Sequence, residues 1–219
     1  MLRKWVATGM IGGLLAIALV GSAGARLGVI EVPLQRPDTH WFWYVSRAAG
    51  MCAYLALVTS VVWGLLLSTG VADAWVARAR SIDIHRWISA VALALIAGHA
   101  LVLLGDPYVR FDMLDLVVPL VAAYRTGGVA LGVLAGYASV AVFGSFWLRR
   151  HLGQRGWRLV HYLAFPTVGL VTLHGLLAGS DSDSPWMRLV YVLTTALVLW
   201  LVTYRVLLRI WTRVPVAAH

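Results

Sequence analysis

Long apolar runs, separated by short polar or charged stretches, dominate this chain. Six of them are long enough for a helix that crosses a hydrocarbon core of about 30 Å, which takes about 20 residues. These runs lie near residues 5–26, 44–70, 84–105, 127–148, 157–178 and 186–211. None shows the strict alternation of apolar and polar positions that a membrane barrel strand requires. The pattern therefore predicts an all-α integral membrane protein, built as a bundle of six transmembrane helices.

The stretch between the third and fourth runs, residues 106–126, is apolar but contains Asp112, Asp115 and Pro119. These residues disfavour a seventh span, so we expect a short re-entrant or interfacial segment on the outer side. No linker of low complexity and no repeat with a fixed period of about 20 to 50 residues divides the chain. We therefore expect one domain over residues 1–219.

Composition and charge agree with a membrane location. The chain of 219 residues is 61% hydrophobic and 12% charged, and its net charge is +9. With the N-terminus inside, most arginines between the spans fall on the inner side and most acids on the outer side, as the positive-inside rule describes. We expect a multi-pass protein of the cell (inner or plasma) membrane, in contact with lipids and with both termini cytoplasmic. The arginines follow helix ends instead of one face, so no nucleic-acid partner is expected.

The first run also has features of a signal peptide, because a basic start precedes it and Ala23-Gly24-Ala25 could be a cleavage site. Its length favours a retained first helix at about 5–26. Cys52 is the one cysteine, so a disulfide framework, an iron–sulfur cluster and a C-x-x-C-H haem attachment are excluded. No nucleotide-binding or hydrolase motif occurs, and no catalytic residue is predicted.

Four histidines lie inside the apolar runs, two in the third run and two in the fifth. His85 and His99 are 14 residues apart, and His161 and His174 are 13 apart, which correspond to rises of about 21 and 20 Å along a helix. The third and fifth spans run in the same direction, so we expect His85 to face His161 and His99 to face His174. Two imidazoles facing each other at each of two levels are the ligands of a b-type haem iron, whereas zinc usually takes further ligands. The pattern predicts two haem b groups.

The angular spacing agrees only for the third helix. At 3.6 residues per turn, His85 and His99 lie within roughly 40° of one face, whereas His161 and His174 lie some 140° apart. Pro166 lies between the latter two, and a proline inside a helix removes a hydrogen bond and bends the axis. Local rewinding near Pro166 is therefore required if both rings are to face the same seam.

Haem propionates need cationic or hydrogen-bonding partners near the membrane surface. Arg86 and Arg158 are the candidates at the inner level, and Arg47 is the candidate at the outer level. For Arg86 and Arg158, the positive-inside rule is an equally good explanation.

The sequence resembles the ferric-reductase-like transmembrane domain, a superfamily that includes ferric reductases, NADPH oxidases and the haem subunit of bacterial periplasmic methionine sulfoxide reductase. The resemblance rests on four segments and covers roughly residues 44–205, the expected haem-binding core. These segments are SRAAG (46–50), DIHRWISAVALALIAGH (83–99), LRRHLGQRGWRLVHYLAF (148–165) and LHGLLAGSD (173–181). The H-x13-H and H-x12-H spacings match the haem-ligand pattern of the superfamily, although the methionine sulfoxide reductase subunit differs at the position of His85.

The resemblance implies transmembrane electron transfer from a cytosolic-side donor, through an inner and then an outer haem, to an outer acceptor. The acceptor could be ferric iron, oxygen or a redox protein. The 219 residues hold no fused flavin and nicotinamide domain. The donor is therefore expected to be a separate reductase, a quinol, or a flavin bound directly to the membrane domain, and a partner could supply such a flavin. The chain would then be the membrane haem subunit of an oxidoreductase. The alternative is a non-catalytic scaffold or partner-binding subunit whose histidines only pack between helices.

Overall fold

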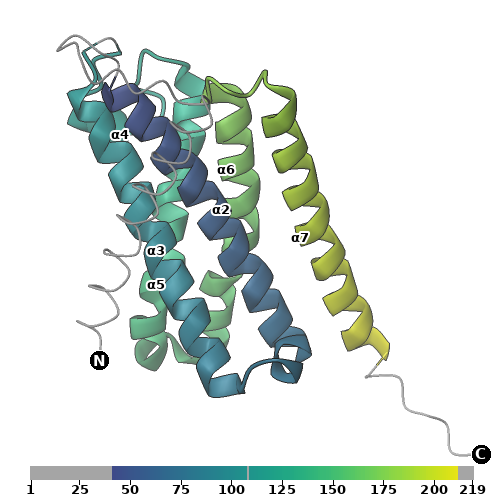
Figure 1. Cartoon of the computed structure of the whole chain (residues 1–219). Coiled ribbons are helices and arrows are strands. Elements are labelled where there is room, and N and C mark those ends of the chain that lie inside the picture. Colours follow the sequence, from purple (N-terminus) through teal and green to yellow (C-terminus); the bar gives the residue numbers. More distant parts are fainter. Residues whose placement is uncertain (1–40, 108, 212–219) are drawn as a thin grey trace, which may run out of the picture.

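A computed structural model describes residues 41–107 and 109–211, and every regular element within these ranges is helical (Figure 1). In chain order these elements are α2 (Trp41–Thr69), the 3₁₀ turn η1 (Val71–Ala74), α3 (Arg78–Val102), the 3₁₀ turn η2 (Leu103–Gly105), α4 (Met113–Val117), α5 (Thr126–His161), α6 (Ala164–Ala178) and α7 (Pro185–Trp211). The predicted all-α class is confirmed for this part of the chain. The predicted first helix, 5–26, lies outside the described residues.

Within the described residues, four helical stretches are long and apolar enough to cross a membrane. They are Trp41–Thr69, Arg78–Gly105, Thr126–Ala178 and Pro185–Trp211. Each coincides with predicted spans, and the third contains two of them. Such a set of helices is characteristic of a multi-pass membrane protein.

The stretch Thr126–Ala178 folds back on itself, so α6 runs beside α5 in the opposite direction (Figure 1). Gly153 interrupts α5 with φ 66° and ψ 171°, a conformation that residues with a Cβ avoid. At the far end, the Arg125 guanidinium donates to the carbonyl oxygens of Leu177 and Gly179, at 3.2 Å each. The start of α5 therefore lies against the end of α6. The predicted inner loop, 149–156, is mostly helical, with Gly153 as its break.

A second irregularity separates α5 from α6, where the sequence requires rewinding. The amides of Leu163 and Phe165 donate to the carbonyls three residues earlier, at 3.0 and 3.1 Å, as in a 3₁₀ turn. The amide of Phe165 donates to the Tyr162 carbonyl. In a regular α-helix the amide of residue 166 would donate to this carbonyl, but Pro166 has no N–H. A 3₁₀ turn advances about 120° per residue instead of about 100°, so this segment adds rotation between His161 and His174.

Helix α2 lies at the centre of the bundle and packs on α3, α6 and α7. The Tyr54 hydroxyl lies 2.6 Å from the Thr194 hydroxyl of α7 and 3.4 Å from the Thr172 hydroxyl of α6. Its ring meets the Tyr191 ring edge to face, with centroids 5.1 Å apart. These contacts tie α6 and α7 to the middle of α2. Helix α7 stands at the edge of the bundle (Figure 1).

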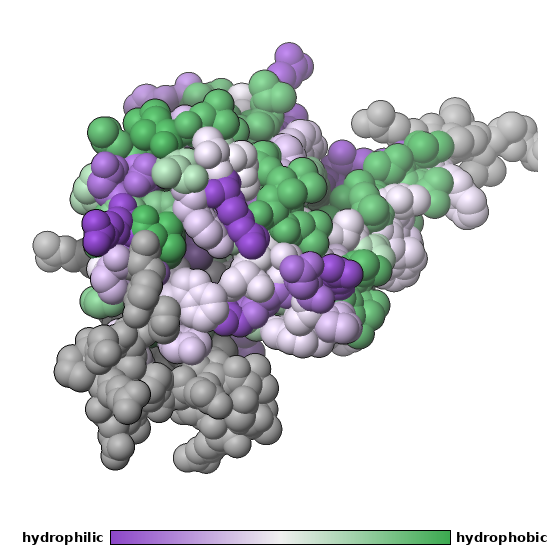
Figure 2. Space-filling view, turned by 90° about the horizontal axis from the view of Figure 1, so that it is seen from above, coloured by the Kyte–Doolittle hydropathy of each residue, from purple (hydrophilic) through white to green (hydrophobic). Residues whose placement is uncertain are grey.

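Among its described residues, the connection between η2 and α5 contains one helix, the five-residue α4 (Met113–Val117), which is too short to cross a membrane. A capping box starts it: the Asp112 carboxylate accepts from the N–H of Asp115, and the Asp115 carboxylate accepts from the N–H of Asp112. Leu114 and Leu120 are exposed on this segment, at 58% and 69% of their surface. The end-on view in Figure 2 shows hydrophilic residues interspersed with hydrophobic ones on this face. Apolar side chains at this end are thus not covered by the described part of the protein.

Candidate haem sites

The structure brings the four histidines of the apolar runs together as two pairs. The ring centroids of His85 and His161 are 6.2 Å apart, and the planes meet at 78°. The centroids of His99 and His174 are 6.1 Å apart, and their planes meet at 75°. Helix α3 supplies one member of each pair, while His161 ends α5 and His174 belongs to α6. The pairs are those that the spacing predicts.

These separations fit a metal ion held between two imidazoles. With each nitrogen about 2 Å from the metal and about 1.1 Å from its own ring centroid, the two centroids of an in-line arrangement are about 6.2 Å apart. Direct hydrogen bonding between two rings, or stacking, would bring the centroids closer or make the planes parallel. In the described part of the chain, no three histidine, cysteine or acidic side chains gather at one metal-binding point. Axial ligation of a haem iron requires only two.

Hydrogen bonds at Nδ1 fix the orientation of the second pair, His99 and His174. Nδ1 of His99 lies 2.8 Å from the carbonyl oxygen of Ser46, and Nδ1 of His174 lies 2.8 Å from that of Gly128. A carbonyl oxygen only accepts, so both Nδ1 atoms carry the proton and both Nε2 atoms keep their lone pair. Histidines that bind metals are typically held this way, because the outer hydrogen bond fixes the tautomer and makes the ligand more basic.

Nδ1 of His85 has a weaker partner. It lies 3.4 Å from the Ser60 hydroxyl, which is itself 2.6 Å from the Ser89 hydroxyl. Ser89 in turn donates to the carbonyl of His85 at 2.8 Å. His161 instead packs its ring on the indole of Trp157. The His85–His161 level is therefore held by side chains. The His99–His174 level is held by main-chain carbonyls, and the Ser46 hydroxyl also lies 3.0 Å from Nδ1 of His99.

Glycines on the neighbouring helices make room for three of the four rings. A methyl group at Gly132 would lie 2.7 Å from Nδ1 and Cε1 of His174. One at Gly50 would lie 3.0 Å from Nδ1 of His99, and one at Gly64 would lie 3.2 Å from Cε1 of His85. Carbon atoms normally stay about 3.5 to 4.0 Å apart, so a side chain at these positions would push the rings aside. The glycines let helix and imidazole approach closely.

Helix α2 carries the same recognition pattern twice. Ser46 and Gly50 contact His99, and Ser60 and Gly64 contact His85. The two S-x3-G patterns, SRAAG and SVVWG, are 14 residues apart, as are His85 and His99 on the antiparallel helix α3. The sequence prediction used SRAAG for its arginine and for the family resemblance, and it missed the second copy, SVVWG. The signal that could have found it is this shared spacing of 14 residues.

A cavity of about 410 Å³ opens beside the His99–His174 pair. Its wall is mostly apolar, and both imidazoles, Gly50 and Gly132 line it together with Arg47. The volume lies within the range of about 300 to 1,000 Å³ that is typical of sites for small molecules and cofactors. An apolar cavity with two convergent imidazoles and a cation at its edge suits a planar, mostly apolar group that carries carboxylates.

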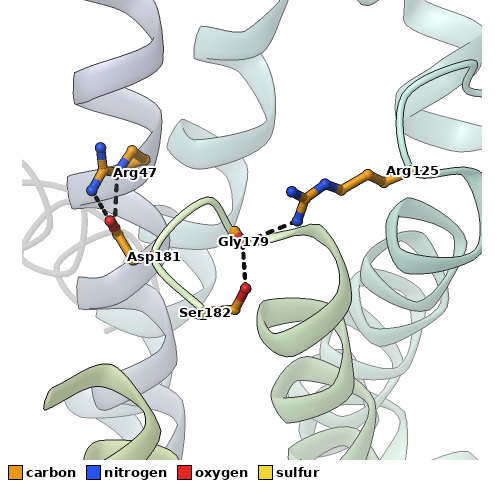
Figure 3. A network of polar contacts seen from close by, with 5 residues as sticks. All are labelled: Arg47, Arg125, Gly179, Asp181 and Ser182. Atoms are coloured by element: carbon orange, nitrogen blue, oxygen red, sulfur yellow. Dashed lines mark hydrogen bonds and ion pairs between the residues drawn. The ribbon is translucent and has the colours of Figure 1, made fainter. Parts of the chain in front are cut away.

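The Arg47 guanidinium binds the Asp181 carboxylate by two hydrogen bonds, one of them 2.8 Å between Nε and Oδ2 (Figure 3). It also lies over the Trp43 ring, 4.3 Å from its centroid. Guanidinium has five N–H donors, so donors remain for a second anion. In the same region Gly179 accepts from Arg125 and from the Ser182 hydroxyl, and these bonds fix the loop after α6 (Figure 3).

The other two predicted propionate partners lie at the opposite end of the bundle. Arg86 donates to Asp83 at 3.3 Å and lies over the Phe146 ring, 4.3 Å from its centroid. Arg158 is exposed. A donor that sequence reasoning missed is Nε1 of Trp157, which is buried and has no hydrogen-bond partner among the described residues. A haem carboxylate is an acceptor that such an N–H could use.

Comparisons of the chain with protein-family models, with curated proteins and with solved structures find no match. The geometry of the two histidine pairs is therefore the basis for any functional conclusion.

Proposed function

We propose that this protein carries electrons across a membrane through two b-type haems, each held by one histidine of α3 and one of the α5–α6 hairpin. The observation that carries the proposal is the occurrence of two histidine pairs with nearly equal centroid separations, 6.2 and 6.1 Å. The 14 residues between His85 and His99 correspond to about 21 Å along α3, so two such sites would extend over most of a hydrocarbon layer of about 30 Å.

Each residue of the site has a separate task in this proposal. His85 and His161 would bind one haem, and His99 and His174 the other. A bound haem supplies reversible one-electron chemistry at its iron. Main-chain carbonyls hold the proton on Nδ1 of His99 and His174, which leaves the Nε2 lone pairs of these two rings available to a metal. The mostly apolar wall of the cavity would surround the haem at the His99–His174 level with side chains of low polarity.

Charge gives the proposal a direction. Arg149, Arg150, Arg155 and Arg158 cluster at the His161 end, and no acidic residue occurs between positions 116 and 180. By the positive-inside rule we infer that this end faces the cytoplasm, with six spans in total and both termini inside. Electrons would then enter at the His85–His161 level, from a separate reductase, a quinol or a partner's flavin. They would leave at the His99–His174 level, to ferric iron, oxygen or a redox protein.

On the opposite side of the membrane, the α4 segment would form the interfacial or re-entrant segment. The exposed Met113, Leu114, Val117 and Leu120 favour contact with lipid there. Kinship with the ferric-reductase-like superfamily is part of the same proposal. It is supported by the resemblance of the motifs and by the paired histidines.

A visible spectrum of the purified protein with a measured haem-to-protein ratio tests the central claim. We expect reduced b-type bands and two haems per chain. A colourless protein that is folded and monodisperse would contradict the proposal and favour the alternative, a scaffold with structural histidines. Dithionite reduces haem without any protein partner. Reduced bands obtained with dithionite alone would therefore demonstrate haem binding whatever the physiological donor is.

Cysteine labelling tests the direction. In a Cys52→Ala background, Arg150→Cys and Met113→Cys place single exposed thiols at opposite ends of the bundle. In intact cells, a membrane-impermeant maleimide should label position 113 and spare position 150 until the cells are opened. Labelling of position 150 from outside would overturn the orientation and the direction of electron flow, while leaving the haem sites untouched.

A further inference from the structure

Trp157 contacts one of the paired histidines by stacking. It precedes His161 by four residues on α5, so the two side chains lie on the same face of the helix. The ring centroids are 5.2 Å apart and the planes differ by 23°, which makes the rings nearly parallel. His161 is at the same time edge to face with His85, at 78°. The indole of Trp157 is therefore nearly parallel to the His161 imidazole and packs against its face, while His85 meets the His161 ring at a steep angle.

A cation holds the indole in turn. Cζ of Arg149 lies over the Trp157 ring, 4.8 Å from its centroid, and Nε of Arg149 donates to the Gln154 side chain at 2.9 Å. Cation–π contacts of this kind contribute about 0.5 to 2 kcal/mol, depending on burial. Because Arg149 and Gln154 lie on either side of the break at Gly153, the contact fixes the indole across the least regular part of α5.

His161 needs such support more than the other three histidines do. It is the last residue of α5 and is followed by the 3₁₀ segment at 160–165, so its backbone lies at a helix end. His99 and His174 are fixed by carbonyl oxygens at 2.8 Å, and His85 is near Ser60 at 3.4 Å. The stack on Trp157 is the corresponding constraint at His161.

We propose that Trp157 is a positioning residue for the haem at the His85–His161 level, because its indole fixes the plane of the His161 imidazole. This inference rests on the proposed function. In a haem with two imidazole ligands, the angle between the ring planes controls the splitting of the iron orbitals. The angle therefore sets the g-values of the oxidised low-spin iron and contributes to its reduction potential.

The test compares Trp157→Phe with Trp157→Leu in the full-length protein. Phenylalanine keeps an aromatic face for the stack, whereas leucine removes it. Trp200→Leu is the matched control, because Trp200 stacks on Tyr204 in α7, at 6.1 Å and 16°, and is 63% exposed. The measurements are haem content, the electron paramagnetic resonance spectrum of the oxidised protein and a redox titration followed in the visible range.

We expect two strongly anisotropic low-spin signals in the unaltered protein, as near-perpendicular ring planes produce. Trp157→Leu should broaden or shift one signal, change one of the two midpoint potentials or release one haem, and leave the other signal unchanged. Trp157→Phe and Trp200→Leu should keep both signals. Two unaltered signals in Trp157→Leu would overturn the positioning role and leave the proposed function intact. A shift of the same signal in Trp157→Phe as large as in Trp157→Leu would also overturn it, because both variants lack the indole N–H and only phenylalanine keeps the aromatic face. Absence of haem from the unaltered protein would overturn the function itself.

Discussion

The two histidine pairs have almost the same separation and angle, yet they are held in place by different groups. At the His99–His174 level, backbone carbonyls accept from both rings, and a cavity of about 410 Å³ adjoins them. At the His85–His161 level, the Ser60 hydroxyl and the Trp157 indole contact the rings. A carbonyl cannot be removed by a side-chain substitution, whereas a hydroxyl or an indole can. The His99–His174 level should therefore tolerate mutation of its supporting residues better than the His85–His161 level.

The largest effect is expected when a ligand itself is removed. His174→Ala should lose about half of the haem, because His85 and His161 lie about 20 Å away along the helices and keep their own site. His161→Ala should also lose about half, but from the other level. Haem content and transfer of electrons from dithionite-loaded vesicles to an outer dye would be measured. Loss of all haem in one folded single variant would mean that the two sites are one.

A smaller effect is expected from the glycines beside the rings. Gly132→Ala should reduce haem content at the His174 level, because the new methyl group would lie 2.7 Å from a ring that the Gly128 carbonyl holds in place. Gly64→Ala, at 3.2 Å from His85, should have a weaker effect. Gly144→Ala is the matched control on the same helix, since nothing lies within 4 Å of its Cβ position and Gly144 does not line the cavity. Equal haem content in all three variants would contradict the close approach seen here.

The serines of the repeated S-x3-G pattern sharpen the contrast between carbonyl and hydroxyl support. Ser60→Ala should shift the midpoint potential of one haem or weaken its binding by about 10-fold, within the range known for outer-shell partners of metal-bound histidines. Ser46→Ala removes a hydroxyl 3.0 Å from Nδ1 of His99 but should change less, because the Ser46 carbonyl still accepts from His99 at 2.8 Å. A larger effect at Ser46 than at Ser60 would reverse the comparison.

The smallest effect is expected at Arg47 and Asp181. Asp181→Asn removes the charge of a pair whose side chains are 31% and 20% exposed, so we expect a loss of about 1 kcal/mol in stability. Arg47→Met should have a similar cost and, if Arg47 also binds a haem carboxylate, should in addition shift the potential of one haem. Thermal unfolding in detergent and the redox titration together separate these two contributions. If Asp181→Asn shifts the haem potential as much as Arg47→Met does, the effect comes from loss of the ion pair and not from a bond between Arg47 and a haem carboxylate.

Much of this picture could be predicted because apolar runs and histidine spacing are local properties of the sequence. The predicted ends of the second and sixth runs, 44–70 and 186–211, differ by at most three residues from α2 (Trp41–Thr69) and α7 (Pro185–Trp211). The equal rise between histidines on two parallel helices was enough to predict which rings meet. The angular spacing of His161 and His174 likewise required rewinding near Pro166, where the 3₁₀ turn lies. In contrast, the break at Gly153 inside a helical 149–156 segment is a feature that no hydrophobic pattern encodes.

The helices and the two levels at which histidines can meet follow from local sequence, because hydrophobicity and helical rise act along one chain segment at a time. Which groups hold each ring depends instead on how the helices pack. Ser46, Ser60 and Gly128 contact histidines 53, 25 and 46 residues away, and such contacts depend on how helices are oriented about their axes. The same holds for Arg47, whose pairing with Asp181 spans 134 residues and joins α2 to the loop after α6.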